Sequence, residues 1–149
     1  MPKPTTWYRS RGVACVEAAL LLPVAVLFVF GFVEYGYYMN CHHVVHDAAR
    51  QGARAAARTE NSNAEVKAAV VASLNHSYSV DASAVTVRIS KLNSGGAEEY
   101  QVMNLSANEQ GHAIRVTVTV DYAQFHPPCD FFGFASQQLA GSVAMPRQN

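Results

Sequence analysis

The sequence lacks the motifs that mark common enzyme active sites. It has no G-x-S-x-G nucleophile turn, no Walker-type phosphate loop and no carboxylate pair in a recognisable catalytic frame. It also has no H-E-x-x-H helix and no C-x-x-C pair, which are the usual frameworks for zinc. These absences favour a protein that is not an enzyme, with no cofactor, no metal and no small-molecule substrate.

The sequence also lacks a net charge, because its 11 basic and 11 acidic residues cancel. Three of the basic residues, Lys3, Arg9 and Arg11, stand near the N-terminus, so the remainder is mildly acidic. Nucleic acid is recognised through basic surfaces that neutralise its phosphates. We therefore expect no nucleic-acid partner.

What the sequence does contain is one long apolar run, from Val13 to Val33, in which Glu17 is the single charged residue. As a helix this run would be about 32 Å long, enough to cross a bilayer core of about 30 Å. It exceeds the core of a secretory signal, which has about 7–15 apolar residues, and no A-x-A cleavage site precedes the polar stretch. We therefore expect one transmembrane helix.

The charges around the run predict its orientation. Basic residues precede the run and acidic residues do not, so the N-terminus is expected in the cytoplasm. In a bacterium the helix would then lie in the inner membrane, and the rest of the chain would lie in the periplasm, where disulfides form. Cys41 and Cys129 are candidates for such a disulfide, with two unbonded thiols as the alternative, whereas Cys15 lies inside the run and is expected to stay a thiol.

Several short motifs surround the apolar run. Gly12 follows a basic leader and Glu17 is the fifth residue after it, an arrangement that looks like a prepilin processing site of the type IV pilin class. Together the motifs resemble the TadE-like (TadE/TadG) pseudopilins of the tight-adherence (Tad) pilus. The residues that carry the resemblance are Val16-Glu17, Pro23, Glu34-Tyr35-Gly36 and Ala48-Ala49-Arg50-Gln51-Gly52-Ala53-Arg54.

The resemblance implies a minor pilin or pseudopilin that takes part in assembly or initiation of a Tad-type (type IVc) pilus for adhesion. It implies cleavage between Gly12 and Val13 by a prepilin peptidase, and pairing of Glu17 with the new α-amine of a neighbouring subunit. An unpaired carboxylate in lipid is costly, so such pairing would favour assembly. The implied partners are other pilins or pseudopilins, the pilus assembly platform, the peptidase and membrane lipid, and the implied destinations include the extracellular pilus.

An alternative class of protein fits the same anchor. The chain would then be an uncleaved single-pass envelope protein whose ectodomain is a binding module. Pro23 also has two interpretations, since it removes the helix hydrogen bond to the Ala19 carbonyl. It is either an ordinary transmembrane kink or a hinge that loosens the helix during assembly.

Helical signals continue beyond the run, so we predict one helix from about Val13 to Arg58. Its polar side carries a stripe of arginines at positions 50, 54 and 58, which is either exposed to solvent or a contact surface. Glu34 and the tyrosines at 35, 37 and 38 are predicted to form an interfacial belt. Small residues on one face would let other elements approach closely: Ala48, Ala49, Gly52, Ala53 and Ala56.

The sequence after Arg58 predicts a small, pilin-like α+β domain in which an antiparallel sheet packs on the helices. Ser62 and Glu65 form a capping box before a second helix at about 63–75. Phenylalanines 131, 132 and 134 are predicted to plug the core, with a partner surface as the alternative. Strands are expected at about 85–89, 100–105, 112–122 and 139–145.

The expected divisions of the whole chain are a cytoplasmic leader (1–12), the transmembrane part of the long helix (13–35), its periplasmic extension (36–58) and an α+β ectodomain (59–149).

Overall fold

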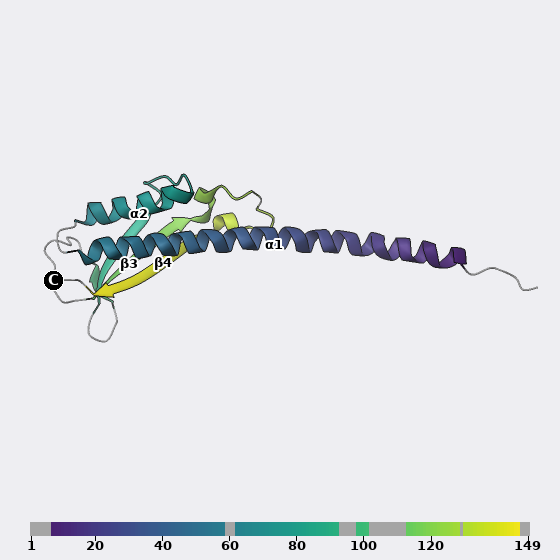
Figure 1. The fold of residues 1–149 in the computed structure, drawn as a ribbon, viewed down its shortest axis with the longest axis horizontal. Helices are drawn as coiled ribbons and strands as arrows, with labels where there is room; N and C mark the ends of the chain where they lie inside the picture. Colours follow the sequence, from purple (N-terminus) through teal and green to yellow (C-terminus); the bar gives the residue numbers. More distant parts are fainter. Residues whose placement is uncertain (1–6, 59–61, 93–97, 102–112, 129, 147–149) are drawn as a thin grey trace, which may run out of the picture.

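A computed structural model describes residues 7–58, 62–92, 98–101, 113–128 and 130–146. The C-terminal part of one long helix packs against a second helix and a sheet, whereas its N-terminal part projects alone (Figure 1). The predicted α+β fold is confirmed. The elements are α1 (Trp7–Ala57), α2 (Asn63–Ser77), β1 (Thr86–Leu92), β2 (Glu98–Gln101), β3 (Ala113–Asp121), the 3₁₀ turns η2 (Tyr122–Phe125) and η3 (Phe134–Ser136), and β4 (Gln138–Pro146).

Helix α1 has 51 residues, which corresponds to a length of about 77 Å. It begins at Trp7 rather than near Val13, so the predicted start of the helix is wrong and residues 7–12 are helical as well. The physical reason is that no proline follows Pro4 until Pro23, and arginine favours helix. The most apolar window of α1 is not buried by any other part of the fold, and the helix is long and apolar enough to cross a membrane.

The small-residue face of α1 is the surface on which the domain is built, as predicted. Ala48, Ala49 and Ala56 are fully buried, and α1 contacts α2, β3 and β4. A Cβ atom at Gly52 would lie 2.6 Å from Cγ2 of Val70 on α2. Only glycine therefore lets the two helices come this close.

The sheet has the strand order β2-β1-β3-β4, and all neighbouring strands are antiparallel. Strand β3 alternates as predicted, and its buried side chains, Ile114, Val116, Val118 and Val120, face the core. Strand β4 crosses α1 closely, because a Cβ atom at Gly141 would lie 2.9 Å from the Val45 carbonyl oxygen. The extension of α1 is thus part of the same core as the sheet.

Helix α2 begins as the sequence predicts. Ser62 is its N-cap, and the capping box with Glu65 is present, with the Ser62 N–H donating to the Glu65 carboxylate at 2.6 Å. Strand β2 starts at Glu98, two residues earlier than predicted. Residues 102–105 of the predicted strand at 100–105, residues 1–6 of the leader and Cys129 lie outside the described residues.

Candidate functional site

The predicted processing site lies on the part of α1 that projects alone, which we call the stem (residues 12–33). Gly12, Val13 and Glu17 are exposed on it. Among the described residues, Glu17 has no hydrogen-bond or ion-pair partner, so its carboxylate is accessible to another molecule. Helix α1 continues without interruption through Pro23. The roles of Gly12, Glu17 and Pro23 remain predictions.

Glu34 has a role that the sequence did not reveal. Its side chain is only 1% exposed, and it is a buried charged group at the point where the stem meets the domain. Its two carboxylate oxygens accept hydrogen bonds from the backbone N–H groups of Phe131, at 3.2 Å, and Phe132, at 3.1 Å. Glu34 therefore holds the loop that precedes β4 against α1.

The predicted interfacial belt is wrong for Glu34, Tyr37 and Tyr38, which face the domain. The Tyr37 hydroxyl donates a hydrogen bond to the Phe125 carbonyl at 2.6 Å, and Tyr38 stacks on Phe134 with ring centroids 5.0 Å apart. The reason is the helix period, because positions 34, 37, 38 and 41 lie on one face, which continues into the small-residue face. Tyr35 and Gly36 of the E-aromatic-G motif are exposed.

Cys41 lies at the centre of this aromatic region and is fully buried. Burial raises the pKa of its thiol, although hydrogen bonds with Tyr78 and Tyr37 act in the opposite direction. Burial also raises the pKa values of Tyr37 and Tyr78. Because Cys129 lies outside the described residues, the Cys41–Cys129 disulfide stays a prediction, which peptide mapping under non-reducing conditions would test.

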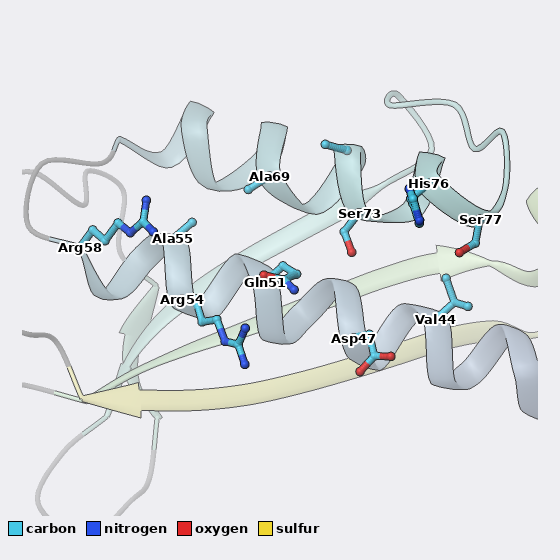
Figure 2. A pocket seen from close by; sticks show the side chains of 11 residues that line it. Val44, Asp47, Gln51, Arg54, Ala55, Arg58, Ala69, Ser73, His76 and Ser77 are labelled. Carbon is cyan, nitrogen blue, oxygen red and sulfur yellow. The ribbon is translucent and has the colours of Figure 1, made fainter.

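The A-A-R-x-G-A-R motif divides between the core and a groove. Its alanines and Gly52 are buried, Arg50 is exposed beside Asp47 at 3.8 Å, and Arg54 lines the groove. The Arg50–Asp47 pair is solvated and contributes little to stability. Figure 2 shows the groove between α1, which supplies Asp47 and Arg54, and α2, which supplies Ser73 and His76. Arg58, directly after α1, also lines the groove, whose volume is about 720 Å³.

Two of the three loop phenylalanines do not plug the core. Phe131 and Phe132 are 64% and 54% exposed, and only Phe134 is half-buried against the core. The interpretation of all three as core residues is therefore wrong for two of them. The side chains of Phe131 and Phe132 point outward because their main chain is fixed, since the N–H groups of both residues point at Glu34.

Histidines 42 and 46 lie one turn apart on α1, with ring centroids 6.1 Å apart. In the part of the chain that the structure describes, no three side chains of His, Cys, Asp or Glu gather where they could hold a metal ion.

Comparison with known proteins identifies a family for the N-terminal part of the chain. A family model described as TadE-like protein matches residues 12–54, which is less than a third of the chain and includes the stem and the A-A-R-x-G-A-R motif. The resemblance stated from the motifs is thereby confirmed. No curated protein and no solved structure matches the chain.

Proposed function

We propose that this chain, TadE-like over residues 12–54, is a membrane-anchored minor pilin or pseudopilin of a Tad-type pilus. It takes part in assembly or initiation of the pilus, and through it in adhesion. The observation that carries the proposal is the exposed stem. Its apolar surface is exposed except where Phe132 lies against Gly31, and the Glu17 carboxylate has no partner among the described residues, so both are available to lipid and to another subunit.

The proposed division of the chain follows from this function. Residues 1–12 form a cytoplasmic leader, 13–35 span the inner membrane, and 36–58 extend α1 into the periplasmic domain of residues 59–149. The basic leader supports this orientation. In a host without the prepilin peptidase, where the leader stays attached, addition of a protease to spheroplasts should digest the domain and leave an N-terminal tag intact. The reverse pattern would contradict the orientation.

Processing after Gly12 is the sharpest distinction between a pseudopilin and an anchored binding module. Packing does not require a glycine at position 12, because nothing lies within 4 Å of a Cβ atom built on Gly12. Glycine is, however, about 1 kcal/mol less favourable in a helix than alanine, so the helix is locally weakened at this point. A peptidase can bind the main chain of α1 where the helix is open.

The test is the mass of the N-terminal peptide from membranes of the native host. A peptide that begins at Val13 is expected, and a host without the prepilin peptidase should give the intact leader. An intact Met1 in the native host would support the uncleaved envelope protein instead.

The role of Glu17 is tested separately. Glu17→Ala should leave membrane insertion and processing unchanged but reduce incorporation into the assembled pilus. The matched control is Asp121→Ala, which removes an exposed carboxylate at the end of β3 that makes no capping hydrogen bond. Equal incorporation of Glu17→Ala and the parent protein would remove the charge-pairing role from the proposal.

A further inference from the structure

The loop between η2 and η3 folds back along the stem. Glu34 fixes the loop main chain through the N–H groups of Phe131 and Phe132. A Cβ atom built at Gly31 would lie 3.4 Å from the Phe132 ring, so this ring rests on α1 about one turn before Glu34. The tip of the loop therefore lies beside the last turn of the apolar run.

The two rings at this tip are exposed and adjoin an apolar surface of α1. Phe131 and Phe132 contact each other edge to face, with ring centroids 5.5 Å apart. Phe132 also forms one wall of an open groove of about 430 Å³. The other wall consists of α1 residues that are almost all apolar: Val24, Leu27, Phe28, Gly31, Phe32 and Tyr35.

The depth of the rings follows from the length of the apolar run. A helix from Val13 to Val33 is about 32 Å long and a bilayer core is about 30 Å thick, so the run ends at the edge of the hydrocarbon. Gly31 lies two residues before that end, about 3 Å inside it. A ring that rests on Gly31 is then at the level where the acyl chains begin.

We propose that Phe131 and Phe132 form a lipid-contacting tip that enters the periplasmic edge of the bilayer. The occupant of the groove is an acyl chain of a membrane lipid, because the groove continues the stem surface that the rest of the fold leaves uncovered. Glu34 makes the insertion possible, since free N–H groups are costly where water is scarce. This inference rests on the membrane insertion of α1 in the proposed function.

The test uses depth-dependent fluorescence quenching by brominated lipids. The full chain, in a Trp7→Phe background that removes its one tryptophan, is reconstituted into phosphatidylcholine vesicles brominated near the headgroup or near the chain end. Three variants each carry one reporter: Phe132→Trp at the tip, Phe32→Trp on the stem and Ala68→Trp on the exposed side of α2. We expect quenching of the first two, stronger with the shallow bromines, and none of the third.

The outcomes separate the inference from the proposed function. Quenching of Phe32→Trp without quenching of Phe132→Trp overturns the lipid-contacting tip and leaves membrane insertion intact, whether water or a second copy covers the rings. Absence of quenching at both positions overturns membrane insertion itself.

A second variant tests the part played by Glu34. Adding Glu34→Ala to the Phe132→Trp protein should reduce its quenching by the shallow bromines, because the loop is released. The same change in the Phe32→Trp protein should leave quenching as before. Unchanged quenching at position 132 would show that Glu34 does not hold the tip in the bilayer.

Discussion

The Glu34 carboxylate accepts a 3.1 Å hydrogen bond from the main chain of Phe132, 98 residues later in the sequence. The first glutamate of the motifs, Glu17, is exposed on the stem, whereas this second one is buried and bonded within the same chain. The two acidic residues of the apolar region therefore have different tasks. Glu17 is available to another molecule, and Glu34 closes the domain against the stem.

Replacement of Glu34 should destabilise the domain. Glu34→Ala leaves two N–H groups without their acceptor, at a cost of about 1–3 kcal/mol for each group that stays unsatisfied. Thermal unfolding in detergent micelles should therefore show a clearly lower midpoint. Glu17→Ala is the control, because its exposed side chain makes no such bonds, and equal midpoints for the two variants would contradict the role of Glu34.

Gly52→Ala should also destabilise the protein. The added methyl group would lie 2.6 Å from Cγ2 of Val70, and overpacking of this kind costs about 1–3 kcal/mol. The control is Gly36→Ala on the same helix, where nothing lies within 4 Å of the added atom. That change should stabilise the helix by about 0.5–1 kcal/mol.

A second-site change checks the cause of the Gly52→Ala effect. Val70→Ala removes the side chain that the new methyl group would meet, so the double variant should lose less stability than the sum of the two single variants. Urea denaturation of the four proteins provides the comparison. Additive losses would place the effect of Gly52→Ala elsewhere than at the contact between α1 and α2.

The capping box of α2 gives a third prediction. Ser62→Ala removes the side chain that accepts from the Glu65 N–H, which should cost about 1 kcal/mol of stability. Glu65→Gln keeps an acceptor for the Ser62 N–H and is expected to be close to the parent protein. Urea denaturation measures both, and a larger loss for Glu65→Gln than for Ser62→Ala would contradict this account.

Alkaline conditions should destabilise the aromatic region around Cys41. Burial raises the pKa of Tyr37 and of Tyr78 above the ordinary value of 10.0, and it raises the pKa of the Cys41 thiol above 9.0. Between those ordinary values and the raised ones, the unfolded chain binds fewer protons than the folded chain. The stability that these groups contribute is therefore complete below about pH 9 and is lost as the pH rises.

The measurement is the midpoint of urea denaturation between pH 7 and pH 11. Tyr37→Phe should make the decline shallower, although it also removes the hydrogen bond to the Phe125 carbonyl. Tyr35→Phe is the control, because this ring is exposed, and its decline should match that of the parent protein. An equal slope for Tyr37→Phe would exclude Tyr37 as a source of the pH dependence.

Local patterns predicted most of the fold. The alternation of Ile114, Val116, Val118 and Val120 gives β3, and the small residues around Gly52 give the face on which the sheet packs. Ser62 and Glu65 mark the start of α2 through contacts within one helical turn. Each of these signals depends on residues that are neighbours in the sequence, so no knowledge of the tertiary structure is needed.

The candidate site was harder to predict because its contacts are distant in sequence. Nothing near Glu34 indicates that its partners are the N–H groups of Phe131 and Phe132. The tyrosines at 37 and 38 follow the apolar run directly, which favours an interfacial belt until the packing of the domain is known. A signal was nevertheless present, because Glu34, Tyr38, Cys41, Val45 and Gly52 recur at three-, four- and seven-residue spacings on one face.

The continuity of α1 fixes an angle as well as a distance. An α-helix turns by about 100° and rises by about 1.5 Å for each residue. Because α1 runs without interruption from the stem into the core of the domain, the direction in which Glu17 points relative to the sheet is set by the number of residues between them. Inserting one alanine after Leu27 would swing Glu17 by about 100° around the helix axis while advancing it by only about 1.5 Å. The residue count between Glu17 and Glu34 therefore sets the rotational orientation in which a neighbouring subunit would meet this one.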